Sequence, residues 1–99
     1  MGNGDLIGLT LTIDSRFTIK GRGTVVVGSL TGDGVLYSGD FAVWPGESFE
    51  VRQIEMFRKV VTEARGGQTV GLLFGADANT EEFGRGMVLQ FQRGFRAGG

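Results

Sequence analysis

The sequence predicts an all-β domain in which about six to seven short antiparallel strands close into a small barrel. Apolar residues alternate with polar residues or glycine along several segments, as in strands that bury one face. Nineteen glycines against one proline in 99 residues supply frequent turns and close backbone approaches. No convincing long helix interrupts the strands, and closure would remove the exposed edges that a flat sheet leaves.

The first half of the chain predicts a long strand followed by a central one. Residues 7–13 alternate between large apolar side chains and small or polar ones, and Phe17 and Ile19 continue the alternation. After a glycine-rich break, the β-branched run 24–30 predicts a strand in the middle of the sheet.

Two dipeptides predict tight turns. Asp-Gly at 33–34 predicts a type I′ hairpin between 24–30 and the short extended piece 35–37, because both residues tolerate positive φ. Pro-Gly at 45–46 suits a type II turn after a strand at 41–44, since proline fixes φ and glycine accepts positive φ.

Local pattern alone leaves the segment from 54 to 65 open between strand and helix. Helical spacing relates Ile54, Phe57, Val61 and Ala64. A strand from 48 to 57 with a bulge near 52–53 instead aligns Phe49, Val51, Ile54 and Met56. The surrounding all-β pattern favours the strand, to about residue 57.

The last third of the chain predicts two further strands, at 69–74 and 87–91. Between them, residues 79–84 could form one capped helical turn ended by Gly84. The whole chain is expected to form a single domain, with flexible ends at 1–5 and 94–99.

Composition narrows the classes of function. With no cysteine and no histidine, the chain has no disulfide or thiolate metal site and lacks the commonest general base, so we expect no catalytic residue, metal or cofactor. A net charge of −1 argues against purely electrostatic binding to a polyanion. No apolar run is long enough to span a membrane and no signal peptide is recognisable, which predicts a cytoplasmic protein.

Five motifs carry a family resemblance. In order they are FTIKGRGTVVVG at 17–28, Gly-Asp at 39–40, IEMFRK at 54–59, VGLLF at 70–74 and RGMVL at 85–89. From about residue 9 to 92 the chain resembles the second domain of bacterial and organellar elongation factor Tu. The resemblance implies a Greek-key translation-factor β-barrel, with a strand followed by a turn at the ambiguous segment. In that family the domain does no chemistry, and it holds the 3′-terminal adenosine of aminoacyl-tRNA beside a GTPase domain.

The family's RNA-binding positions fall on six residues of this chain: Glu55, Arg58, Ile19, Val25, Leu73 and Arg85. By resemblance, the glutamate contacts the adenosine and the first arginine lies near the adjoining phosphate. The three apolar residues line the adenine pocket, and the last arginine approaches the RNA backbone. The residue types suit these roles, since carboxylates accept from ribose hydroxyls, arginines bind phosphate and apolar groups support a base.

The resemblance is incomplete in ways that bear on function. The chain differs from the family pattern at Asp14-Ser15-Arg16, where the family has an acidic pair that borders the aminoacyl pocket, and at Thr69, where the family has asparagine. The resemblance therefore implies the adenosine pocket but not the pocket for the amino acid. No Gly-x-x-x-x-Gly-Lys-Ser/Thr motif occurs, so the chain is not expected to hydrolyse GTP or to be an enzyme. A single barrel would bind the acceptor end of tRNA weakly, with a Kd of roughly 10⁻⁴ M or higher.

Several alternatives stay open at this stage. One function is an RNA-contacting module that works with a GTPase domain or another protein in trans; the other is a stand-alone protein-interaction or structural barrel that has lost RNA binding. Glu55 and Arg58 could also be a solvated charge pair at a strand end. Of four phenylalanines that could stack on bases, at least three are expected in the core: Phe57, Phe74, Phe83 and Phe91.

Overall fold

The structure, a computed structural model, describes residues 6–44, 47–76, 78 and 80–94. This part of the chain contains ten strands and no helix: β1 Leu6–Ile19, β2 Gly23–Gly32, β3 Val35–Tyr37, β4 Phe41–Trp44, β5 Glu47–Glu50, β6 Gln53–Met56, β7 Lys59–Val61, β8 Glu63–Arg65, β9 Thr69–Gly75 and β10 Val88–Gln92. The all-β prediction is confirmed. The strands outnumber the predicted six to seven because the segment from 47 to 65 divides into pieces of three or four residues.

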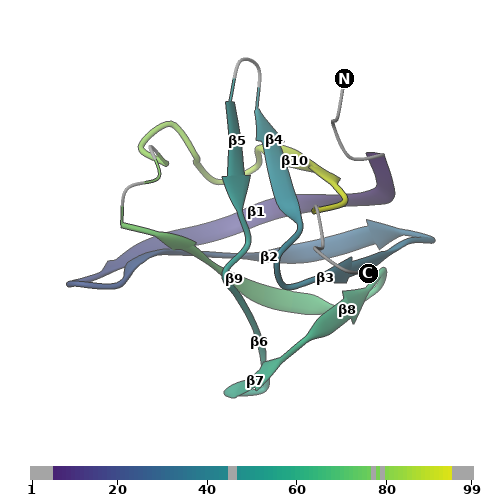
Figure 1. The fold of residues 1–99 in the computed structure, drawn as a ribbon, viewed down its shortest axis with the longest axis horizontal. Helices are drawn as coiled ribbons and strands as arrows, with labels where there is room; N and C mark the ends of the chain where they lie inside the picture. Colours follow the sequence, from purple (N-terminus) through teal and green to yellow (C-terminus); the bar gives the residue numbers. More distant parts are fainter. Residues whose placement is uncertain (1–5, 45–46, 77, 79, 95–99) are drawn as a thin grey trace.

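Eight of the strands form one antiparallel sheet in the order β5-β4-β10-β1-β2-β9-β6-β7, and β3 pairs with β8 in a second, two-stranded sheet. The sheets curve around a shared interior, with the β4–β5 hairpin at the top of Figure 1 and the β6–β7 hairpin at the bottom. β5 contacts β9, and the backbone N–H of Arg52 donates to the carbonyl of Leu73 at 2.8 Å. Closure into a complete barrel stays a prediction.

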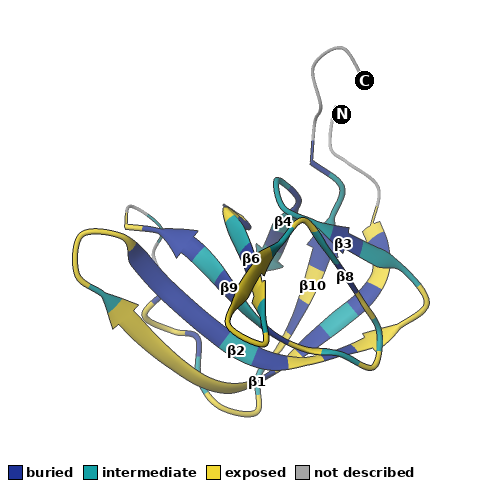
Figure 2. Cartoon of the chain, turned by 90° about the horizontal axis from the view of Figure 1, so that it is seen from below, coloured by how far each residue is buried: buried dark blue, intermediate teal, exposed yellow. Residues whose placement is uncertain are grey.

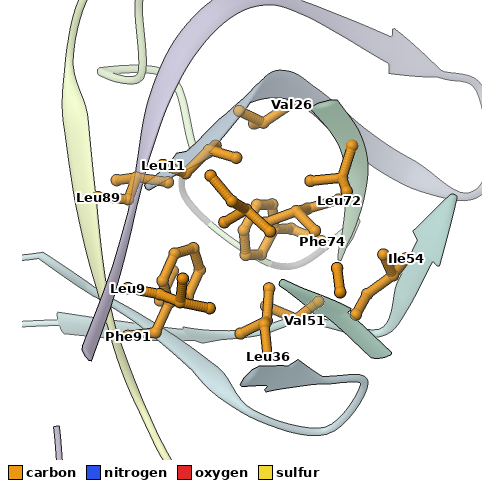
Figure 3. Close-up of a cluster of buried hydrophobic side chains, with 14 of the residues drawn as sticks. Leu9, Leu11, Val26, Leu36, Val51, Ile54, Leu72, Phe74, Leu89 and Phe91 are labelled. Atoms are coloured by element: carbon orange, nitrogen blue, oxygen red, sulfur yellow. The ribbon is translucent and has the colours of Figure 1, made fainter. Parts of the chain in front are cut away.

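Side chains from both sheets fill the interior (Figure 3). Its fully buried members include Leu11, Val26, Leu36, Ile54, Leu72 and Leu89. Phe74 packs edge-to-face against Phe49 and Phe83, with ring centroids 6.3 Å and 5.9 Å away. Since Phe74, Phe83 and Phe91 are buried, the prediction that at least three of the four phenylalanines are core residues is confirmed.

A β-bulge in β1 decides which face of the sheet each later residue of that strand occupies. Ile13 pairs with Gly28 and Ser15 with Val27, so Asp14 is the extra residue. Because side chains alternate with period two, one extra residue moves all that follow to the opposite face. Phe17, which alternation alone would place in the core, is therefore 51% exposed. In Figure 2 the corresponding half of β1 is coloured as exposed while the adjacent β2 is buried.

The type I′ hairpin predicted at 33–34 is wrong. Neither Asp33 nor Gly34 has positive φ, and it is Gly32 that adopts φ 128°. The backbone N–H of Gly34 donates to the carbonyl of Gly8 in β1 at 3.1 Å, so this turn is held against another strand. β3 consequently leaves β2 and pairs with β8, where Leu36 covers the core.

The helix alternative for 54–65 is excluded, and the strand followed by a turn is confirmed. Ile54 pairs with Val61 across the β6–β7 hairpin, and Met56 pairs with Lys59. The predicted continuous strand from 48 to 57 is interrupted at 51–52, where the backbone of Val51 instead exchanges hydrogen bonds with Gly39 and Asp40. This interruption lies beside the bulge expected near 52–53 and likewise changes which face is buried.

The turn between β6 and β7 has the type I′ form that was predicted elsewhere. Phe57 and Arg58, its two central residues, have φ 51° and 64°, a conformation that residues other than glycine, asparagine and aspartate rarely adopt. Phe57 is 91% exposed, so no core packing compensates this backbone strain.

Substituting the turn therefore tests the strain. The double change Phe57→Asn with Arg58→Gly is expected to raise the free energy of unfolding by about 1 to 2 kcal/mol, because asparagine and glycine accept positive φ. Urea unfolding measures the gain. Asp33→Asn, in a turn without positive φ at that position, should leave the stability unchanged. A loss of stability in the double variant would contradict the assigned turn geometry.

Other predicted elements have mixed outcomes. The strands expected at 69–74 and 87–91 are β9 and β10. No helix forms from 80 to 84; the N–H of Phe83 donates to the carbonyl of Thr80 at 3.0 Å in a simple turn. The predicted Pro-Gly turn at 45–46 lies outside the described residues, as do residues 1–5 and 95–99 of the ends that were predicted to be flexible. Gly94, the first residue of the predicted flexible C-terminal end, donates its N–H to Asp40 Oδ1 at 2.8 Å. Within the described ranges there is no helix of the length and hydropathy needed to cross a membrane.

Candidate functional site

The structure brings four of the six predicted residues together around one shallow pocket of about 30 Å³. The pocket lies on the outer face of the sheet, over β2, β9 and β6, on the side opposite the core. Its lining consists of Ile19, Val25, Glu55 and Leu73 from the predicted set, with Arg22, Gln53 and Gly71 in addition. We call this feature the outer-face pocket.

Strand register explains how these residues meet. Val25 in β2 pairs with Leu73 in β9, which pairs with Gln53 in β6, so the three side chains form a row across the sheet. The adjacent row across the same strands contains Val26, Leu72 and Ile54, which are all buried in the core. Because neighbouring rows of a sheet face opposite sides, the pocket row faces outward. Val25 is only 7% exposed there, because its neighbours on the outer face cover it. The β1 bulge supplies one of these neighbours by turning Ile19 outward.

Gly71 forms the floor of the pocket. It pairs with Val27 on one side and with Glu55 on the other. A Cβ atom at this position would lie 3.3 Å from Val25 Cγ1 and 4.0 Å from Glu55 Cβ. The hollow therefore exists because residue 71 has no side chain.

Two polar side chains meet at the edge of the pocket. Arg22, in the turn between β1 and β2, donates from Nη2 to Oε1 of Gln53 at 3.1 Å. The bond joins segments 31 residues apart in the sequence and is exposed to solvent. Exposed hydrogen bonds of this kind contribute only about 0.5 to 1.5 kcal/mol, so a ligand can displace it.

Besides Arg22, the exposed charges near the pocket are Glu55, on its rim, and Arg58, three residues later in the β6–β7 turn. Both side chains are exposed, and no salt bridge joins them among the described residues. Arg58 does not belong to the pocket lining.

Arg85 is the predicted residue that the structure separates from the pocket. It lies in the loop before β10, which is bound to the β1 bulge through Gly86 N–H to the Ile13 carbonyl at 2.7 Å. Arg85 does not line the outer-face pocket. Arg16, one of the departures from the family pattern, donates from Nη1 to the carbonyl of Thr80 at 2.9 Å and so ties β1 to the turn that follows β9.

Sequence reasoning did not select Arg22, Gln53 or Gly71. Arg22 and Gly71 stand inside the motifs GRGTVVVG and VGLLF, and Gln53 directly precedes IEMFRK, so motif proximity was the available signal. What identifies them is the pairing of β9 with both β2 and β6. Gly28 lies at a close crossing of β1 and β2, where an added Cβ would collide with the carbonyl oxygen of Thr12.

Comparisons with known proteins give two informative similarities. No protein-family model matches the chain. The chain is similar to a bacterial selenocysteine-specific elongation factor, EF-Sec, with a TM-score of 0.71 and 28% identity over 84% of this chain and 14% of that one. It is also similar to translation elongation factor SelB from Methanococcus maripaludis in its apo form, with a TM-score of 0.69 and 32% identity over 83% of this chain and 18% of that one.

The chain therefore spans less than one fifth of the length of either factor. The similarity covers most of this chain, includes sequence as well as fold, and lies in a β domain rather than a catalytic one. The resemblance inferred from the motifs is thus confirmed: the chain is similar to a β domain of translation elongation factors, consistent with the second domain of elongation factor Tu.

Proposed function

We propose that this chain is a non-catalytic translation module that binds the 3′-terminal adenosine of tRNA in the outer-face pocket. The observation that supports the proposal most directly is the convergence of Ile19, Val25, Glu55 and Leu73 on one pocket. These residues come from three separate motifs of the resemblance. Similarity to elongation factors supports the link to translation.

The proposed binding mode follows from the lining. The apolar surfaces of Val25 and Leu73 would support one face of the adenine ring, and the Glu55 carboxylate would accept from a ribose hydroxyl or the base amine. Because the Arg22–Gln53 hydrogen bond is exposed at the edge of this shallow pocket, a base that lies against the pocket can displace it. Arg22 is then released to bind the phosphate, together with Arg58.

The proposal extends to the closure of the sheet, the location of the protein and its partner. We propose that the sheet closes into a Greek-key barrel through β5 and β9, whose contact supports closure. We propose a cytoplasmic location, where tRNA is used. A GTPase domain or another protein would act as partner, since a pocket with one base and two arginines supports only weak binding, with a Kd of roughly 10⁻⁴ M or higher.

Binding of a complete tRNA end tests this function. Isotope-labelled chain is titrated with an acceptor-stem RNA ending in CCA and with the same RNA lacking the terminal adenosine. Amide shifts at Ile19, Val25, Glu55 and Leu73 are expected only with the complete end. Glu55→Gln should weaken binding about tenfold or more, because a hydrogen bond to a charged group is worth about 1.5 to 3 kcal/mol.

Two further variants sharpen the test. Gly71→Ala should also weaken binding, because the added methyl group occupies the floor of the pocket 3.3 Å from Val25 Cγ1. Glu63→Gln, on β8 in the other sheet, is the matched control and should bind like the unaltered chain. Equal binding of both RNAs, or full affinity in Glu55→Gln, would refute the adenosine pocket. The alternative of a protein-interaction barrel would then be favoured.

A further inference from the structure

We propose that the β6–β7 turn forms a second nucleotide subsite, which takes the base that precedes the terminal adenosine. This inference rests on the proposed function, because the second subsite is reached by a ligand already held in the outer-face pocket. The subsite is a cavity of about 450 Å³ bounded by Met56, Phe57, Gly67, Gln68 and Thr69. We call it the turn subsite.

The two sites lie in sequence along the same strands. On β9, Leu73 and Gly71 border the outer-face pocket, and Thr69, next on the same face, borders the turn subsite. On β6, Glu55 borders the first site, and Phe57 follows two residues later at the second. Two residues of a strand span about 7 Å. One extended nucleotide can cross that distance, so adjacent bases of a single strand can occupy both sites.

Phe57 provides the surface for stacking. It is 91% exposed and sits at the tip of a hairpin in a conformation that is strained for a bulky residue. A strained, exposed aromatic side chain that contributes nothing to the core is more readily explained by a ligand than by stability. Stacking on an aromatic ring is the commonest way in which proteins hold an unpaired base.

Polar groups beside Phe57 complete the subsite. The Gln68 Oε1 atom accepts a hydrogen bond from the Arg65 backbone N–H at 2.7 Å, which fixes the side chain and leaves its amide nitrogen able to donate to a base. Thr69 is exposed and carries a hydroxyl that can donate or accept. These groups suit the edge of a nucleobase better than an apolar side chain of a protein.

The charge of the turn suits the RNA backbone between the two bases. Arg58 and Lys59 directly follow Phe57, both are exposed, and within the described ranges neither forms an ion pair. An aromatic ring next to two unpaired cations is the combination that binds single-stranded nucleic acid, with the ring on the base and the cations on the phosphate. The turn therefore favours RNA over a protein partner.

A set of three small ligands separates the two sites. Adenosine 5′-monophosphate probes the outer-face pocket alone, the dinucleotide CpA probes both sites, and CpA with an abasic first position keeps the linking phosphate without the base. Affinities are measured by NMR titration of the intact chain. CpA should bind at least about fivefold more tightly than its abasic form, the lower end of the range for one stacked base.

Substitutions assign that gain to Phe57. In Phe57→Ser the difference between CpA and abasic CpA should disappear, while the affinity for adenosine monophosphate stays within about twofold. Val60→Ser, at another exposed apolar residue of the same hairpin outside the subsite, should keep the full difference. Proton chemical shifts of the Phe57 ring should move with CpA and not with the monophosphate.

The outcomes distinguish the two proposals. If the monophosphate binds but CpA gains nothing over its abasic form, the turn subsite is refuted and the outer-face pocket is retained. If the gain survives in Phe57→Ser, the base lies elsewhere and the turn is left as a candidate protein contact. If no ligand binds, the proposed function fails, and the turn subsite fails with it.

Discussion

Replacing Phe74 with alanine is expected to lower the free energy of unfolding by about 3 to 5 kcal/mol. Phe74 is fully buried and its ring contacts Phe49 and Phe83 edge-to-face. Truncation removes the apolar area and both aromatic contacts, and it leaves a cavity between strands whose backbone positions are fixed by pairing. Because a domain of this size is stable by only about 5 to 15 kcal/mol, the variant should be close to unfolding at 37 °C.

Urea denaturation followed by circular dichroism measures this effect. Phe74→Leu keeps most of the volume and should lose less, which provides a folded variant if the alanine change prevents folding. Phe57→Ala is the matched control, because the same atoms are removed from a side chain that is 91% exposed, and the change should be within about 0.5 kcal/mol. A loss below about 1 kcal/mol for Phe74→Ala would contradict the aromatic cluster.

Replacing Asp40 with alanine is expected to have the second largest effect, about 3 kcal/mol of lost stability. The Asp40 side chain is fully buried, and its carboxylate accepts from Arg93 Nη1 at 2.6 Å, from the Tyr37 N–H at 2.7 Å and from the Gly94 N–H at 2.8 Å. Arg93 also donates to the Val35 carbonyl and lies 5.0 Å from the Tyr37 ring centroid. Removing the carboxylate leaves these donors without their acceptor.

Two companion variants separate charge from hydrogen bonding at this cluster. Asp40→Asn keeps one acceptor oxygen and should lose less stability than the alanine variant, although the ion pair with Arg93 is gone. Asp33→Ala removes an exposed carboxylate and should change stability little. Hydrogen exchange at Gly94 should accelerate in Asp40→Ala, because its N–H donates to that carboxylate. An unchanged exchange rate at Gly94 would contradict the hydrogen bond between its N–H and the Asp40 carboxylate.

Much of the fold could be predicted from local pattern. The alternation at 7–13 placed its apolar residues correctly in the core, and the β-branched run at 24–30 is the central strand β2. These predictions succeeded because period two is imposed by strand geometry at every residue. The position of Phe17 could not be found in this way, since the extra residue at Asp14 appears only when β1 is paired with β2.

The residue types preferred in turns predicted the positions of the turns less well. Asp33-Gly34 has the preferred residues for a type I′ turn and does not form one, whereas Phe57-Arg58 has unfavourable residues and does. Propensity differences of about 1 kcal/mol are small beside the pairing of whole strands and the burial of residues such as Leu36. Tertiary packing therefore decided where the strained turn lies.

The sequence by itself determined the all-β class, the family resemblance and the residue types of the candidate pocket. Only the tertiary structure decided which of those residues meet. Ile19, Val25, Glu55 and Leu73 meet because β9 pairs with both β2 and β6 and because the β1 bulge turns Ile19 outward, whereas Arg85 lies in another loop. The physical reason is that a binding surface depends on pairing between distant strands, and local periodicity contains no information about which strands pair.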